Sequence, residues 1–318
     1  MFYGNYRFEG PPKKKYNLFR VFLLVTVLIC LLVSIIVIAS YLIHSAQNQK
    51  AQQEMAAEFH QDSVVAGAAA QTISYQSSPT VVPSTPTAKY VFEATPTLSP
   101  TQSQKFFQVV GIPTQEFRSL IRKNPDVIGW ITIDGVVDQP VVFRDNTYYM
   151  THDVNRNPNS CGAIFLDEDH PIHEESQNLL IYGHNMKDQS MFGKLQKYLD
   201  IVFLRNHYTI TFSTRYDTFT YLIFSVAHLS VNPNSQGFLC FWEHPKFENA
   251  EAFRSYIASI NKHSIFTPYL AVDENDTLLT LVTCDGNDEE RLVIFARRQR
   301  QSDTPESIRH AQLNLVPR

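Results

Sequence analysis

Residues 277–297 read TLLTLVTCDGNDEERLVIFAR. Two runs rich in aliphatic, β-branched and aromatic residues, 277–284 and 291–297, flank six residues that are all polar or glycine. This pattern predicts two antiparallel strands joined by a short connection. Cys284 then lies roughly opposite Arg291, and opposite residues of an antiparallel pair point to the same face. The sequence therefore predicts a thiol and a guanidinium together at one end of a sheet.

Similar runs, bounded by Gly, Asn, Asp and Pro, precede this hairpin and predict six more strands. They cover 127–133, 136–143, 162–167, 178–183, 208–213 and 218–228. Helical spacing of apolar residues predicts helices at 113–125, at 190–206 with Asp188 as its cap, and at 248–261. Eight strands at irregular spacing do not fit regular βαβ units. The expected fold class is mainly β, a mostly antiparallel barrel or sandwich with inserted helices.

A third reactive side chain follows the strand at 178–183. His184 comes directly after Gly183, where a rigid apolar strand passes into a loop. Cysteine, histidine and arginine together indicate nucleophilic acyl transfer, in which a thiolate attacks a carbonyl, an imidazolium protonates the leaving amine and a guanidinium stabilises the oxyanion. Taken singly, each residue also has an ordinary explanation as a buried small side chain, a turn residue or a strand-edge cation.

An apolar stretch near the N-terminus predicts one membrane-spanning helix. Residues 18–43 read LFRVFLLVTVLICLLVSIIVIASYLI, with Arg20 as the only charge. At about 1.5 Å per residue this helix exceeds a hydrocarbon core of about 30 Å. A cleaved signal peptide is the alternative, but its apolar region is only about 7–15 residues long. Basic residues gather before the stretch, so we expect residues 1–17 in the cytoplasm and the rest outside.

Residues 44–104 are rich in Ala, Gln, Ser, Thr and Pro and carry no sustained apolar period. We expect a disordered tether here, although residues 47–60 could continue the membrane helix for a few turns. The folded catalytic domain is expected at 105–300, followed by a polar C-terminal tail at 301–318.

Composition excludes several classes of protein and of site. The net charge of −4 gives no support to nucleic-acid binding. There is no C-x-x-C pair, which argues against a zinc or thioredoxin site, and we expect no cofactor and no metal. The Asn-rich stretch 153–159 lacks the Gly and Glu of a calcium loop, and it is interpreted as a solvated turn. His170, His173, Glu174 and Glu175 could suggest a metal site, but no H-E-x-x-H spacing occurs, and they are interpreted as part of a polar loop. An odd number of cysteines, Cys161, Cys240 and Cys284, lies outside the membrane, so at least one thiol is free unless it pairs between molecules.

Beyond these patterns, the chain resembles the sortases, and among them class B. The sortase signature T-L-x-T-C followed shortly by Arg appears as Thr280-Leu281-Val282-Thr283-Cys284 and Arg291. The class B pattern around the histidine is similar to residues 178–186, NLLIYGHNM, continuing to MFGKL at 191–195. The resemblance covers about 113–298 and includes NPDVIGWI at 124–131 and GAIF at 162–165.

The resemblance implies an eight-stranded sortase-like β-barrel with an N-terminal helix, preceded by one transmembrane helix. It also implies a cysteine transpeptidase at the surface of a Gram-positive cell. Such an enzyme cleaves the C-terminal sorting signal of a surface protein, in class B an Asn-Pro-x-Thr type, and transfers the protein to a cell-wall amine. By matching position, Cys284 is the nucleophile, His184 the acid/base and Arg291 the oxyanion or substrate-positioning residue. Asn146, Met150 and Asp285 match positions that line the sorting-signal groove.

Two alternatives remain open from the sequence. One is a catalytically inactive exported barrel that binds peptide or wall components. The other is an L,D-transpeptidase, which also uses Cys and His for acyl transfer, but its usual S-H-G-C run is absent because Val282-Thr283 precede Cys284.

Overall fold

The computed structural model describes residues 18–73, 113–170, 176–284 and 289–318. The chain divides into two compact units, Met1–His44 and Ser45–Arg318. The elements are α1 (Leu18–Ile73), α2 (Gln115–Lys123), β1 (Val127–Ile133), β2 (Val137–Val142), η2 (Tyr148–Met150), β3 (Ile164–Leu166), β4 (Asn178–His184), η3 (Gly193–Leu199), α3 (Ile201–Asn206), β5 (Thr209–Thr214), β6 (Thr218–Ser230), α4 (Ala250–His263), β7 (Leu278–Cys284), β8 (Glu290–Arg298) and α5 (Pro305–Gln312).

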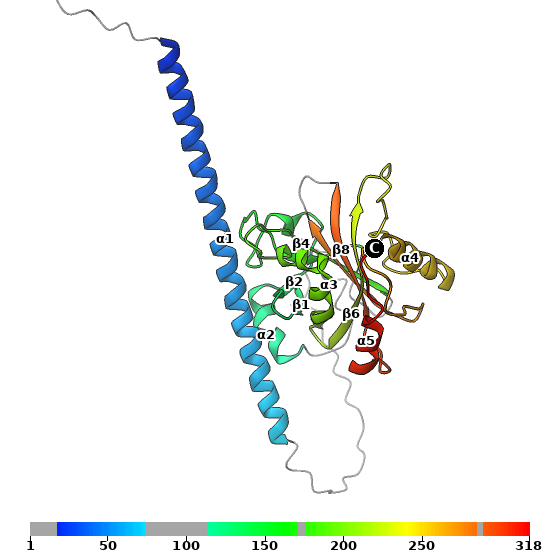
Figure 1. Cartoon of the computed structure of the whole chain (residues 1–318). Coiled ribbons are helices and arrows are strands. Elements are labelled where there is room, and N and C mark those ends of the chain that lie inside the picture. Colours follow the sequence, from blue (N-terminus) through cyan, green and yellow to red (C-terminus); the bar gives the residue numbers. More distant parts are fainter. Residues whose placement is uncertain (1–17, 74–112, 171–175, 285–288) are drawn as a thin grey trace, which may run out of the picture. The chain divides into compact units, whose positions relative to one another are not determined.

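The strands close into a barrel in the order β1-β2-β3-β4-β7-β8-β6-β5 (Figure 1). Neighbouring strands are antiparallel except for two parallel pairs, β2 with β3 and β4 with β7. The predicted mainly β, mostly antiparallel barrel is therefore confirmed. The eight predicted strands all form, with ends that differ by no more than a few residues, because each run supplies apolar side chains to a buried face.

Two hydrophobic clusters cover the barrel from outside. Helix α4 begins at Asn249, whose side chain accepts hydrogen bonds from Glu251 and Ala252 backbone N–H groups. Its buried side chains, among them Phe253 and Ile260, pack with residues of β4, β6, β7 and β8. On another part of the barrel, α2 and residues 51–59 of α1 pack with β1, β2 and β3 around Trp130.

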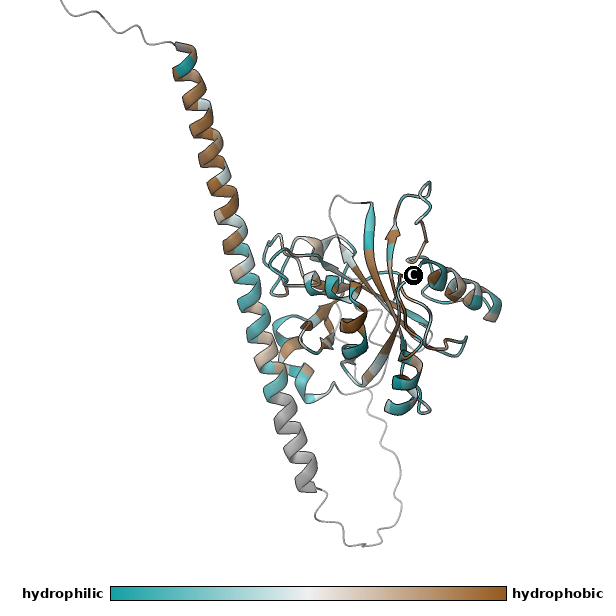
Figure 2. Cartoon of the chain, in the orientation of Figure 1, coloured by the Kyte–Doolittle hydropathy of each residue, from teal (hydrophilic) through white to brown (hydrophobic). Residues whose placement is uncertain are grey.

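The first unit contains the apolar part of α1. Its Leu, Ile, Val and Phe side chains are exposed, and by length and composition alone this helix can cross a membrane. In Figure 2 the helix is hydrophobic along this part and hydrophilic further on.

Over the first part of the expected tether at 44–104, the structure shows the alternative that the sequence left open, a continuation of the apolar helix through residues 47–60. Helix α1 continues to Ile73, and within the second unit residues 45–60 bury one side against the barrel domain. The buried side chains recur three and four residues apart, as a helix face requires. Residues 74–104, like the expected cytoplasmic segment 1–17, lie outside the described residues.

Two further expectations are corrected. The helix predicted at 190–206 is interrupted, because Asp200 adopts an extended conformation between η3 and α3 and its carboxylate accepts from the Val202 N–H as an N-cap. Asp188 instead accepts from Ser190.

The chain from 301 onward is not a loose polar tail. Thr304 and Ser307 form a capping box at the start of α5, and Ile308 and Leu315 are buried. The buried Arg297 guanidinium binds Asp303 through two hydrogen bonds of 2.7 and 2.9 Å, which fixes the turn before α5.

Candidate active site

The predicted nucleophile and acid/base residue end two neighbouring parallel strands. In the β4–β7 ladder, Asn178 pairs with Leu278, and the register continues without a shift until His184 pairs with Cys284. Both residues are the last of their strands. The backbone therefore brings the two positions together at one end of the barrel.

Arg291 belongs to the next strand of the same sheet. The β7–β8 ladder runs from Leu278↔Arg297 to Val282↔Val293, and continuing its register by two residues sets Cys284 opposite Arg291. Arg291 also pairs with Leu229 of β6, and its guanidinium donates a 3.0 Å hydrogen bond to the Glu290 carbonyl. The predicted hairpin register agrees with this arrangement.

The His184 ring is held by main-chain groups. Its Nε2 lies 2.8 Å from the Met150 carbonyl oxygen, so Nε2 carries the proton and donates. Gly162 lies against the same ring: it has a left-handed φ of +60°, and a Cβ added to it would lie 2.5 Å from the Tyr149 oxygen and 3.0 Å from His184 Cδ2. The Met150 carbonyl therefore orients the imidazole, and Gly162 leaves room for the ring to pack closely against the backbone.

The backbone at His184 is fixed by the loop that follows. A Cβ at Gly183 would meet the Phe192 ring at 2.7 Å, so glycine allows the fully buried Phe192 to pack against the strand end. The Phe192 N–H donates to the His184 carbonyl at 3.0 Å, and Asn185 pairs with Met191 in an isolated β-bridge. The loop 185–192 thus returns directly onto His184.

Two of the three predicted groove residues lie on the segment that contacts His184. Asn146 is tied at both ends of its amide: Nδ2 donates to Asp167 Oδ2 at 3.2 Å, and Oδ1 accepts from the Glu168 N–H at 3.0 Å. Met150 is partly exposed, and its carbonyl binds His184. Asp285, the third, lies outside the described residues.

Comparison with known proteins identifies the family. A Sortase domain model matches residues 131–299. The chain is 33% identical over 179 residues to Sortase B of Listeria monocytogenes, covering 56% of this chain and 70% of that protein. The chain belongs to the sortase family.

Further comparisons support the predicted class B. This sortase is 28% identical over 204 residues to Sortase B of Staphylococcus aureus, covering 61% of this chain and 81% of that one. The structure of a Staphylococcus aureus sortase B–substrate complex superposes with a TM-score of 0.55 and 26% identity, covering 63% of this chain and 94% of that chain. This sortase is therefore a cysteine transpeptidase of the cell-wall sorting type, and the predicted fold and enzyme class are confirmed.

Two other cysteines of this sortase, Cys161 and Cys240, are free thiols with raised pKa values. Burial, followed by the charge of Asp188, raises the pKa of Cys161 to about 11. Burial, followed by the neighbouring Glu243, raises the pKa of Cys240 to about 12. Because the thiolate is the nucleophile, neither residue competes as a reactive group near neutral pH.

His170, interpreted from the sequence as part of a polar loop, belongs to a buried polar network. Its side chain is fully buried, and its Nδ1 lies 3.0 Å from Asp167 Oδ1, so this carboxylate joins His170 to Asn146. Asp153 and Asn159 are buried as well, and Asp153 accepts from the N–H groups of its own turn. Among the described residues, no group of His, Cys, Asp and Glu could hold a metal.

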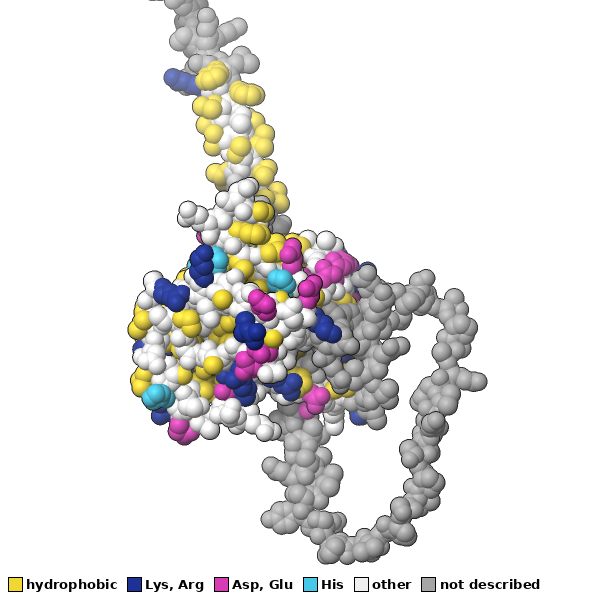
Figure 3. All heavy atoms as spheres, turned by 90° about the vertical axis from the view of Figure 1, so that its right-hand side faces the viewer, with side chains coloured by type: hydrophobic (Ala, Val, Ile, Leu, Met, Phe, Trp, Pro, Cys, Tyr) yellow, Lys and Arg dark blue, Asp and Glu magenta, His cyan; other side chains and the backbone are white. Residues whose placement is uncertain are grey.

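On the face that Figure 3 shows, both acidic and basic side chains are exposed among the described residues. The signals that sequence reasoning missed are the backbone partners of His184 and the contacts of α1, since a carbonyl acceptor or a close approach to glycine leaves no residue-type signature.

Proposed function

We propose that Cys284, His184 and Arg291 carry out the transpeptidation of this sortase on a C-terminal sorting signal of the Asn-Pro-x-Thr type. The single observation that carries the proposal is the register of β4 and β7, in which His184 pairs with Cys284. Arg291, two residues beyond the last paired position of the β7–β8 ladder, completes the group.

In the first half-reaction, the Cys284 thiolate attacks the carbonyl carbon of the signal's threonine and forms a C–S bond. Arg291 donates hydrogen bonds to the oxyanion of the tetrahedral intermediate. The C–N bond then breaks, and the His184 imidazolium gives its proton to the departing amine. The product is a thioester on Cys284 and a released C-terminal peptide.

In the second half-reaction, an amino group of a peptidoglycan precursor or cross-bridge attacks the thioester. His184, now neutral, accepts the proton that this amine loses. The C–S bond breaks, the thiolate of Cys284 is regenerated, and the surface protein is joined to the wall through a new amide. Two protons are exchanged with His184 in opposite directions, so the enzyme returns to its starting state.

Asn146, Met150 and Asp285 are proposed to line the groove for the signal. The support for Met150 is its carbonyl, which orients the imidazole of His184, and Asn146 lies on the same segment, two residues before η2 (Tyr148–Met150). Partners are therefore surface proteins that bear the signal and a cell-wall amine.

We further propose that residues 18–43 anchor the enzyme in the cell membrane, with residues 1–17 cytoplasmic and the folded domain extracellular. The length of the apolar helix and the basic residues that precede it support this orientation.

Mass spectrometry of the full-length protein in nanodiscs, incubated with Asn-Pro-x-Thr peptides, tests the proposal. We expect an acyl adduct on Cys284 and its transfer to triglycine, the amine probe. Cys284→Ala should abolish adduct and cleavage, whereas Cys240→Ala, the matched thiol control, should retain both. Cleavage that survives in Cys284→Ala, or an adduct on another residue, would overturn it.

A further inference from the structure

Residues 45–61 of α1, here called segment 45–61, dock on the barrel domain through one continuous face. Their buried side chains are Ser45, Asn48, Ala51, Gln52, Met55 and Phe59. This spacing of three and four residues is that of a packed helix face, but half of its members are polar. The face therefore has an apolar end and a polar end.

The apolar end attaches the segment to the scaffold. The Phe59 ring stacks on Trp130 of β1, with centroids 4.4 Å apart and planes 5° apart, and meets Phe117 of α2 edge-on at 5.5 Å. Met55 is 1% exposed in the same cluster. These contacts explain why the segment docks, but they involve no residue near His184.

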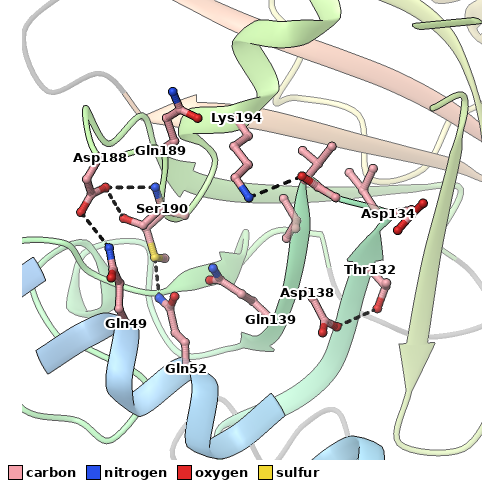
Figure 4. Close-up of a pocket in the computed structure, with 15 residues that line it drawn as sticks. Gln49, Gln52, Thr132, Asp134, Asp138, Gln139, Asp188, Gln189, Ser190 and Lys194 are labelled. Atoms are coloured by element: carbon pink, nitrogen blue, oxygen red, sulfur yellow. Dashed lines mark hydrogen bonds between the residues drawn. The ribbon is translucent and has the colours of Figure 1, made fainter. Parts of the chain in front are cut away.

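The polar end contacts the groups that surround His184. Gln52 Nε2 donates to the Met191 sulfur at 2.8 Å, and Asn48 Nδ2 lies 3.4 Å from the same sulfur and 3.5 Å from the Gly162 carbonyl. Ser45 and Gln49 donate to the Asp188 carboxylate. Figure 4 shows Gln49 and Gln52 extending from α1 toward this loop.

Met191 is in a conformation that needs support. Its φ is +52°, and Gln189, two residues earlier, has a φ of +64°, both in the left-handed region that non-glycine residues rarely adopt. Such residues persist where the surroundings hold them. A pocket of about 440 Å³ lies between this part of the loop and the β1–β2 hairpin. Gln49 and Gln52 of segment 45–61 also line this pocket, so the segment supports the loop where the hairpin does not fill the space beside it.

Asn48 indicates that the polar end has a role besides packing. Its side chain is 1% exposed, and its Oδ1 has no hydrogen-bond partner in the part of the chain that the structure describes. An unsatisfied buried acceptor destabilises the folded state, whereas an apolar residue of similar size carries no such cost.

We infer that segment 45–61 positions the catalytic histidine, with Asn48 and Gln52 as positioning residues. They hold Met191 and Gly162. Met191 pairs with Asn185 and precedes Phe192, whose N–H binds the His184 carbonyl, and Gly162 seats the imidazole. Segment 45–61 thus sets the orientation of the acid/base group. This inference rests on the role of His184 in the proposed function.

The test uses the full-length protein in nanodiscs. Gln52→Leu and Asn48→Leu put an apolar side chain of similar size on the docked face and remove the amide N–H donor to Met191. We expect kcat for peptide cleavage to fall about tenfold, because small displacements of a catalytic group are costly, while KM changes less than twofold. The pH–rate profile should shift as well. Gln53→Leu, exposed on the same helix, is the matched control and should match the parent.

Hydrogen exchange separates positioning from a general loss of stability. In both variants the backbone amides of residues 184–192 should exchange faster than in the parent, whereas the exchange rates over β1 should be unchanged. Met191→Leu, which removes the acceptor, should reproduce the fall in kcat. Unchanged kcat in all three variants, or a fall matched by a lower Tm and faster exchange throughout the barrel, would overturn the inference. Parent protein that forms no Cys284 adduct would instead refute the proposed function.

Discussion

Helix α4 and segment 45–61 both cover the outside of the barrel, yet they bury different chemistry. The buried side chains of α4 are Phe253, Tyr256, Ile257 and Ile260. Segment 45–61 buries a serine and two amides besides its apolar residues. Helix α4 packs along the outer faces of strands, whereas the polar end of segment 45–61 contacts the loop that returns onto His184.

The difference separates a covering helix from a positioning helix. Apolar burial stabilises without fixing direction, because it depends on area removed from water. Hydrogen bonds fix the distance and orientation of their partners. Helix α4 is therefore expected to contribute mainly to the free energy of unfolding. Segment 45–61 is expected to contribute less to stability and more to the position of the groups around His184.

Truncating one aromatic anchor of each helix gives the largest expected effect. Phe253→Ala should lower the free energy of unfolding by about 3–5 kcal/mol, because Phe253 is fully buried, and leave kcat of the folded enzyme unchanged. Phe59→Ala should cost less, about 1–2 kcal/mol, but lower kcat by undocking segment 45–61. Urea unfolding and steady-state cleavage measure the two quantities. Equal loss of kcat in both variants would remove the distinction.

The two unreactive thiols report on the two helices separately. Cys161 is fully buried and interacts with Asn48 of segment 45–61, whereas Cys240 is partly buried and lies near Tyr256 of α4. At pH 8 Cys161 should react with iodoacetamide about 100-fold, and Cys240 about 1000-fold, more slowly than an unfolded thiol, because their pKa values are raised to about 11 and 12.

Phe59→Ala should speed the alkylation of Cys161 alone, and Phe253→Ala that of Cys240 alone. Peptide mapping by mass spectrometry assigns the rates. If either variant accelerates both thiols, the helices do not dock independently.

A smaller effect is expected from Asp167, whose buried carboxylate binds Asn146 and His170. Asp167→Asn replaces one acceptor oxygen with a donor, so the bond to Asn146 or to His170 is lost. We expect KM for the sorting peptide to rise about threefold to tenfold and kcat to stay within twofold. Asp169→Asn, exposed on the same turn, is the control. An unchanged KM would show that the buried Asp167 does not position the groove residue Asn146, so that positioning by buried polar groups would apply to His184 alone.

The smallest effect concerns acid. Burial raises the pKa of Asp188, but hydrogen bonds from Ser190, Ser45 and Gln49 outweigh it, so the folded pKa lies below the ordinary value of 3.8. Asp188 therefore stabilises the folded state above pH 3.8, and this contribution is lost as pH falls through the lowered folded pKa. The Tm of the parent should exceed that of Asp188→Asn at pH 5, and the difference should vanish near pH 2. A Tm difference between the parent and Asp188→Asn that stays constant from pH 5 to pH 2 would contradict the lowered pKa of Asp188.

Most of the barrel could be predicted because period and composition carry the information. The runs at 127–133 and 178–183 have aliphatic and aromatic side chains between turn residues, and both are strands. The predicted antiparallel pairing of the last two strands forms, with paired residues from Leu278↔Arg297 to Val282↔Val293.

The remainder depended on partners distant in sequence. Asn48 and Gln52 lie in an Ala- and Gln-rich segment whose composition favours a tether, and only the loop around Met191, about 140 residues later, gives them a buried face. The Met150 carbonyl that orients His184 is a main-chain group, which every residue possesses. Likewise, the C-terminal residues fold because Leu315 reaches the core and Arg297 binds Asp303.

The β4–β7 ladder also constrains when the enzyme becomes competent. His184 and Cys284 pair across about a hundred residues of intervening chain, so the entropy of closing that long loop must be overcome before they meet. A chain still emerging from synthesis or export has its imidazole long before its thiol. With Cys284 as the proposed nucleophile, chemistry begins only when the last strands have inserted, and a polypeptide that ends before residue 278 cannot close the barrel.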